Sequence, residues 1–287
     1  MADFRDAAPL STKDAWGLFL TGFVPGLLQI RLGEKKLGAS ALLSCLCLFF
    51  AGFWLVQDRI FYYALVSPER NGEEATWLTT LASLGLPITF PEFLNLPATV
   101  LGSWWTFDSS FEGERLWRLP RDLEHLGSFL TAASGMLAAF WSADAFWRHK
   151  LRRNRLAPGK GLNPAVAAGM SWLLPGLAHA KLGQKGKGIL ITLCMLLVFA
   201  LGMIVSEGYA IDRGQAPIWW MGQQLFGGGA LLSALVFAPL QTDHYLPGLE
   251  LGLDLTTVAG FLNLVIMVDA YTIAERQGLA SASEAAS

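Results

Sequence analysis

Two aspartates occur in the same sequence context, each near the end of a hydrophobic segment. Asp144 precedes Ala145-Phe146, and Asp269 precedes Ala270-Tyr271. An ionisable side chain at membrane depth is energetically costly, which makes each carboxylate a candidate for proton or ion handling. The alternative is an interfacial acid that forms a structural ion pair. The expected partners are bases of two nearby turns: Arg31 or Lys35 for Asp144, and Lys181 or Lys185 for Asp269.

His179 is a further candidate, because an imidazole near a membrane surface can bind a lipid headgroup or a metal ion. It follows Pro175-Gly176, and the other three histidines come from unrelated positions. The three cysteines lie in apolar segments and form no CxxC pair and no cluster with histidine. We therefore expect a hydrogen-bonded histidine at a helix end, and neither a metal site nor a cofactor.

No pattern of catalytic residues accompanies these side chains. The sequence contains no Gly-x-Ser-x-Gly and no His-Glu-x-x-His. Gly227-Gly228-Gly229 is not followed by the Gly-Lys-Ser/Thr of a phosphate-binding loop, and its small residues instead predict close helix packing. The sequence therefore predicts a protein that is not an enzyme.

The elements that position these residues are hydrophobic helices. Hydrophobic residues make up 53% of the 287 residues and charged residues only 15%, whereas soluble domains carry about 25% charged residues. Five segments are each long enough to cross about 30 Å of hydrocarbon: 37–56, 127–147, 188–205, 219–240 and 255–272. The sequence predicts an all-α, polytopic helical membrane protein with about 6–8 membrane-embedded helices.

One motif occurs twice. Residues 25–38 match residues 175–188 at a constant offset of 150, with identity at seven of fourteen positions. The positions that we single out as turn or lipid-binding candidates are Pro25, Gly26, Arg31, Gly33, Lys35 and Gly38 in the first copy, and Pro175, Gly176, His179, Lys181, Gly183, Lys185 and Gly188 in the second.

A second match lies at an offset of 125 residues. Leu130-Thr131, Ser134-Gly135 and Asp144 correspond to Leu255-Thr256, Ala259-Gly260 and Asp269. Since the two matches occur in the same order along the chain, they indicate two repeated units, and the interface between such units is often where substrates bind. The predicted organisation is an N-terminal tail, a first membrane unit, a basic linker, a second membrane unit and a disordered Ala/Ser-rich tail: 1–12, 13–147, 148–163, 164–274 and 275–287.

The motif resembles the hairpin of a two-transmembrane-helix domain family, in which an apolar helix ends in Pro-Gly-x-Gly-His/Gln-x-Tyr-x-Gly before a second helix. His179 and Gln29 occupy the position of the family's His or Gln. The family's second Gly is replaced by Leu28 or Ala178, and its aromatic residue by a base. The resemblance covers about fifteen residues in each half. It implies a tandem helical hairpin in an uncharacterised bacterial group and implies no activity.

The physical properties of the motif have two interpretations. Proline disturbs the preceding helix and glycine permits close backbone approach, so the motif fits a structural turn between two helices. Lysine and arginine at such a turn also complement anionic lipid, so the second interpretation is a site for a lipid headgroup or another ligand; we favour the structural turn.

Two topologies are compatible with the sequence. The basic residues concentrate near the N-terminus, in the two motif turns and in the linker. The positive-inside rule places all three regions in the cytoplasm if segments 15–30 and 164–180 are re-entrant and each unit crosses the membrane twice. If segments 15–30, 77–105, 164–180 and 219–239 all cross as well, each unit contributes four spans, and the linker lies opposite the motif turns. We favour the first arrangement on charge.

The sequence leaves three functional classes. We expect a non-enzymatic scaffold, assembly or lipid-interacting protein of a bacterial inner membrane, with the bilayer, anionic headgroups, a membrane protein or a second copy as partner. A small transporter or channel with a pathway between the repeats is the alternative. A lipid-modifying enzyme would need clustered polar residues that the sequence lacks. The net charge of −2 argues against a nucleic-acid partner.

Overall fold

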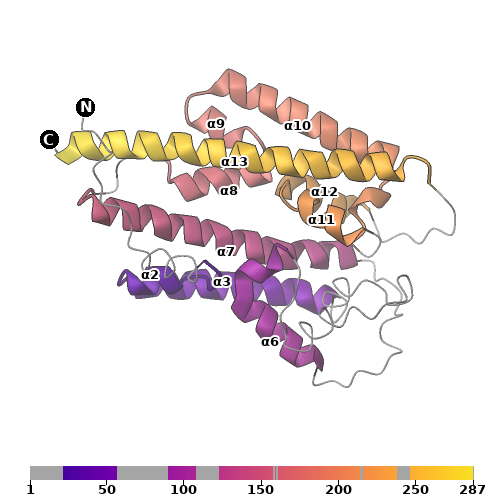
Figure 1. Cartoon of the computed structure of the whole chain (residues 1–287), viewed down its shortest axis with the longest axis horizontal. Helices are drawn as coiled ribbons and strands as arrows, with labels where there is room; N and C mark the ends of the chain where they lie inside the picture. Colours follow the sequence, from indigo (N-terminus) through magenta and orange to yellow (C-terminus); the bar gives the residue numbers. More distant parts are fainter. Residues whose placement is uncertain are drawn as a thin grey trace.

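The computed structural model describes residues 22–56, 90–107, 123–157, 159, 161–213, 216–237 and 246–286. Within these ranges the chain is helical and contains no strand (Figure 1), which confirms the predicted all-α class. The N-terminal tail 1–12, residues 15–21 of the first apolar segment and residues 77–89 of the segment 77–105 lie outside the described residues.

Four helices of the described chain are long and apolar enough to cross a membrane: α3 (Lys35–Val56), α7 (Glu124–Arg153), α10 (Lys185–Val205) and α13 (Leu249–Ala286). They contain four of the five hydrophobic segments that the sequence predicts. Large apolar side chains point away from the protein along them, as at Leu197 and Val265, which are 70% and 65% exposed. Such surfaces are expected where lipid, rather than water, covers the helix.

The fifth predicted segment, 219–240, is not one helix. It divides into α11 (Pro217–Gln223) and α12 (Gly227–Val236), with a turn at Gln224–Phe226. The three glycines that follow the break begin α12 and allow α8 to approach closely, because glycine has no side chain. Gly227 packs on the indole of Trp172 and Gly229 on the ring of Phe199, so the predicted close packing is confirmed.

The long helices form two pairs, α3 with α7 and α10 with α13. In Figure 1 the two pairs lie above and below a layer that contains α8 (Pro164–Leu173), α11 and α12. Helix α8 contacts both α7 and α13, and α12 contacts α7. The second unit therefore packs on the first through its short helices.

Each pair has a close helix–helix contact at glycine. A Cβ atom on Gly52 would lie 2.6 Å from the carbonyl oxygen of Gly127, and one on Gly202 would lie 3.0 Å from that of Gly252. Gly52 and Gly202 are 150 residues apart, and Gly127 and Gly252 are 125 apart. The two pairs thus make the same contact at the offsets that the sequence matches define.

The remaining described elements are short: α2 (Leu27–Arg31), the 3-10 helix η3 (Glu92–Asn95), α6 (Leu96–Phe107), α9 (Leu177–Lys181) and the 3-10 helix η5 (Tyr209–Ile211). At a rise of about 1.5 Å per residue, a helix of ten residues such as α8 reaches only about halfway through the hydrocarbon.

The C-terminal segment differs from its prediction. Residues 275–286 are expected to be disordered, but α13 continues to Ala286. Alanine has the highest helix propensity, and the segment also packs on the rest of the protein: Gly278 contacts the Trp147 ring, and Ala282 is 2% exposed. Tertiary contacts therefore stabilise a helix in a segment whose composition alone is typical of a disordered tail.

The two motif turns have the same backbone structure. Gly26 and Gly176 have φ values of 83° and 87°, a left-handed conformation that favours glycine. A Cβ atom on Gly26 would overlap the carbonyl oxygen of Gly38, and one on Gly176 would overlap that of Gly188. The motif glycines are therefore required by the contact between the turn and the first long helix of each unit.

Gly176→Ala tests this contact. The substitution places a side chain in a left-handed conformation and against a backbone oxygen, so we expect a loss of about 2 kcal/mol or more in stability. The melting temperature of the detergent-solubilised protein, measured by intrinsic fluorescence, should fall by several degrees. Gly186→Ala is the matched control, because no atom lies within 4 Å of its added Cβ. Equal melting temperatures for the two variants would show that Gly176 is not required for the contact between the turn and the long helix.

Candidate functional site

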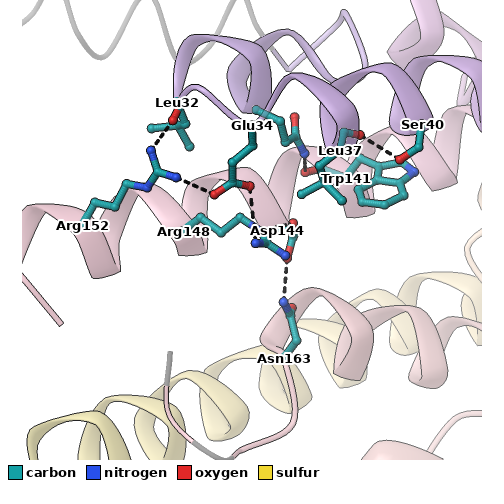
Figure 2. A network of polar contacts seen from close by, with 10 residues as sticks. Leu32, Glu34, Leu37, Ser40, Trp141, Asp144, Arg148, Arg152 and Asn163 are labelled. Atoms are coloured by element: carbon teal, nitrogen blue, oxygen red, sulfur yellow. Dashed lines mark hydrogen bonds and ion pairs between the residues drawn. The ribbon is translucent and has the colours of Figure 1, made fainter. Parts of the chain in front are cut away.

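Asp144 lies in a network of polar contacts where the two units meet (Figure 2). Its carboxylate accepts hydrogen bonds from Arg148 Nε and Asn163 Nδ2, each at 2.6 Å. Arg148 and Arg152 also pair with Glu34, at 3.4 and 2.5 Å. The Asp144 side chain is 9% exposed, so the contacts compensate the burial of its charge.

This network joins the first unit to the start of the second. Asn163 is the N-cap of α8, and its Oδ1 atom accepts a hydrogen bond from the backbone N–H of Ala165 at 2.8 Å. One asparagine therefore binds Asp144 of α7 with its amide nitrogen and fixes α8 with its amide oxygen. An ion pair of 3.0 Å between Lys150 and Glu275 adds a contact between α7 and α13.

Asp269 forms the corresponding contacts in the second unit with different partners. Its Oδ2 atom lies 3.0 Å from His179 Nε2 and 2.6 Å from Lys187 Nζ. His179 is fully buried, which confirms the prediction of a hydrogen-bonded histidine at a helix end. Its counterpart Gln29 is also buried, and its Nε2 atom donates to the carbonyl oxygen of Trp141 at 2.8 Å.

The predicted ion-pair partners are wrong for both aspartates. Asp144 pairs with Arg148, one helical turn away on its own helix, rather than with Arg31 or Lys35. Asp269 pairs with Lys187 rather than with Lys181 or Lys185. The reason is the direction of the side chains and not their exposure, because Lys187 is 48% exposed and still reaches Asp269.

The motif residues separate into two groups. Seven are buried: Pro25, Gly26, Gly38, Pro175, Gly176, His179 and Gly188. Six are exposed: Arg31, Gly33, Lys35, Lys181, Gly183 and Lys185. The buried group has a structural role, and the four bases of the exposed group supply positive charge.

We call the end of the molecule that carries both motif turns the basic end. Among the described residues, four acids at this end are paired: Glu34 with Arg148 and Arg152, Asp144 with Arg148, Asp269 with Lys187, and Glu275 with Lys150. Eight exposed basic residues form no ion pair within the described chain: Arg31, Lys35, Lys36, Arg153, Arg155, Lys181, Lys185 and Arg276. The basic end therefore has a surplus of positive charge.

A second polar site lies between the units and is not anticipated from the sequence. Glu92 Oε1 accepts from Arg213 Nη1 at 2.7 Å and from Thr131 Oγ1 at 3.0 Å. The side chains of Glu92 and Arg213 are 0% and 2% exposed. The guanidinium of Arg213 also lies 4.1 Å from the ring centroid of Trp220, a cation–π contact.

The sequence gives little indication of this site because Glu92 and Arg213 lie in the middle segments, where the repeat is not detectable. Glu124, at the start of α7, is a further buried acid, with 2% exposure. In the described residues, no group of three or more His, Cys, Asp or Glu side chains could hold a metal ion.

The Glu92–Arg213 pair generates a double-mutant prediction. Glu92→Gln or Arg213→Gln alone leaves a buried charge without its partner, which costs about 3–5 kcal/mol. The combined variant removes both charges, so its loss should be smaller than the sum of the single losses by about 1–3 kcal/mol. Denaturant stability in detergent micelles provides the measurement. Additive losses would show that the two side chains do not interact.

Comparison with known proteins gives one match. Residues 166–280 match a family of unknown function (DUF6677). No curated protein and no solved structure matches the chain. The matched region begins in α8 and ends in α13, so it covers most of the second unit, with His179, Lys187 and Asp269, and none of the first. The second half of the chain is therefore similar to DUF6677, a family to which no activity is attached.

Proposed function

We propose that this chain is a duplicated, multi-pass membrane protein whose basic end binds anionic lipid headgroups and which acts as a non-enzymatic scaffold. The observation that carries the proposal is the surplus of exposed, unpaired lysine and arginine around both motif turns. Each basic residue close to an anionic surface contributes about 1 kcal/mol of attraction. Eight such residues at one end of a protein with four long apolar helices would hold a layer of acidic lipid at that end.

Duplication of one unit is supported by contacts at the same offsets in both halves. The two turns repeat their left-handed glycines, and each buries a polar side chain, Gln29 or His179, against the second long helix. Thr131 and Thr256 are both buried and both hydrogen-bond a side chain from the middle of their own unit. These contacts also support the relationship to tandem helical hairpins that the motif suggests.

We place the basic end in the cytoplasm, with two crossings per unit. Arg152 at the end of α7 donates to the carbonyl oxygen of Leu32 in the first motif turn, so the basic linker and that turn lie at the same end. The positive-inside rule then orients this end toward the cytoplasm of a bacterial inner membrane. A layout with four crossings per unit would separate the linker from the turn.

A small transporter is the second candidate, and the buried Glu92–Arg213 pair favours it. Charged pairs inside membrane proteins often lie on substrate or ion pathways, and this one joins the middle segments of the two units. The pair also has a simpler role, because it fixes the two units in one relative position.

Charge removal at the turns tests the lipid proposal. We expect the combined substitution of Lys35, Lys36, Lys181 and Lys185 by Gln to reduce retention of phosphatidylglycerol at least tenfold in native mass spectrometry. The control replaces the same four lysines by Arg, which keeps the charge and should retain the lipid. Equal retention by wild type, Gln variant and Arg variant would contradict headgroup binding at the turns.

A further inference from the structure

Two short segments of the second unit enter the protein from opposite ends and meet near its middle. Helix α8 begins at its N-cap Asn163 beside Asp144, at the basic end, and ends at Leu173. Helix α12 ends next to Phe237, whose ring packs on Gly208 beyond the far end of α10. The first residues of α12 and the last residues of α8 are in contact (Figure 1).

The contact between the two segments is direct. A Cβ atom on Gly228 would overlap the carbonyl oxygen of Leu173, so the start of α12 packs on the end of α8. The indole Nε1 of Trp172 donates to the carbonyl oxygen of Gln224 at 2.8 Å. Together α8 and α12 have 20 residues in two pieces, about the length of one membrane crossing.

Asn263 of α13 links both segments. Its Nδ2 atom donates to the carbonyl oxygen of Leu225 at 2.9 Å and lies 3.4 Å from that of Trp172. Asn263 is fully buried and lies at the centre of the apolar segment 255–272. Polar side chains within apolar helices commonly form hydrogen bonds to neighbouring helices, and Asn263 does so at the middle of its apolar segment.

Three residues of this junction each have a buried side-chain oxygen atom without a hydrogen-bond partner among the described residues: Ser171 Oγ, Gln224 Oε1 and Asn263 Oδ1. All three side chains are at most 1% exposed. Because the amide nitrogen of Asn263 is directed at the two backbone carbonyls, its amide oxygen is the atom that receives no hydrogen bond from the described residues. Each buried acceptor without a partner costs about 1–3 kcal/mol, and a membrane interior offers no solvent that could offset this cost.

We propose that the junction of α8 and α12 is a membrane-embedded binding site for a monovalent cation of the size of Na⁺. Hard cations are coordinated by oxygen atoms, and amide and hydroxyl oxygens suit a cation of low charge. Interrupted helices that end at mid-depth supply such oxygens in ion-coupled membrane proteins, from side chains and from the carbonyls at the helix ends. No carboxylate is among the three orphan acceptors, which disfavours a divalent ion.

The site is separate from the lipid surface of the basic end. Ser171, Gln224 and Asn263 belong to α8, the α11–α12 turn and α13, and none of the eight unpaired basic residues is among them. A variant of the turn lysines should therefore leave cation binding unchanged, and a variant of the junction should leave lipid retention unchanged.

The test is the melting temperature of the purified full-length protein in detergent, in NaCl, LiCl, KCl and choline chloride at equal ionic strength. We expect NaCl to raise the melting temperature by about 3–5 °C over choline chloride, since a ligand that binds only the folded state stabilises it. Ser171→Ala and Asn263→Ala should each remove at least half of this rise. Ser134→Ala is the matched control, because this buried hydroxyl of the first unit donates to Thr131 at 2.6 Å, and it should keep the full rise.

Two outcomes would overturn the proposal. Identical melting temperatures in all four salts would mean that the oxygens are satisfied by water or by a rearrangement rather than by a cation. A rise in NaCl that persists in Ser171→Ala would place the ion elsewhere. Ser171→Ala is the deciding variant if Asn263→Ala does not fold, because it removes one oxygen atom and none of the hydrogen bonds that join the segments.

Discussion

The absence of hydrogen-bonding solvent in hydrocarbon is the constraint on which the arrangement of this protein depends. A helix that ends or turns inside an apolar layer must have its polar groups satisfied by other parts of the protein. The chain does this in several places. Asn263 bonds the carbonyls of both interrupted segments, Asn163 caps α8 while holding Asp144, and Asn95 bonds the carbonyl oxygen of Cys45 at 3.1 Å in the middle of α3. In each case one amide side chain joins elements that are far apart in sequence.

The two halves of the chain satisfy their buried polar groups at corresponding sequence positions, but with different side chains. Gln29 and His179 both fix a motif turn to the second long helix, but one bonds a backbone carbonyl and the other a carboxylate. Thr131 bonds Glu92, whereas Thr256 bonds Gln223. Glu92 in turn pairs with Arg213 of the other unit. Divergence between two copies of a unit would allow such an asymmetric contact, because only one copy needs each partner.

The sequence predicts the helical class, four long helices and the motif turns because these depend on local properties. Runs of apolar residues and the pattern of proline and glycine are visible without tertiary information. The ion-pair partners of Asp144 and Asp269 were predicted wrongly, since proximity in a helix and side-chain direction decide them. Arg148 lies one helical turn from Asp144 on α7, and Lys187 lies in the first turn of α10, beside Asp269.

Other features depend on long-range contacts that composition does not reveal. The break of segment 219–240 at Gln224 depends on α8 meeting it, and the helix at 275–286 depends on packing against Trp147. Glu92 and Arg213 come from segments without a detectable repeat, so neither spacing nor composition identifies them as a pair. One sequence signal could have drawn attention to them: Glu92 is the only charged residue from 75 to 107, and Arg213 is the only lysine or arginine from 188 to 275.

The central claim is that both motif turns and the basic linker share one end of a membrane protein with two crossings per unit. Cross-linking of Glu34→Cys with Arg152→Cys in native membranes, in a background without the three natural cysteines, tests it most directly. The 2.5 Å pair between these side chains predicts efficient linkage by a short bismaleimide. No linkage, together with labelling of the two cysteines from opposite faces of the membrane, would contradict the account.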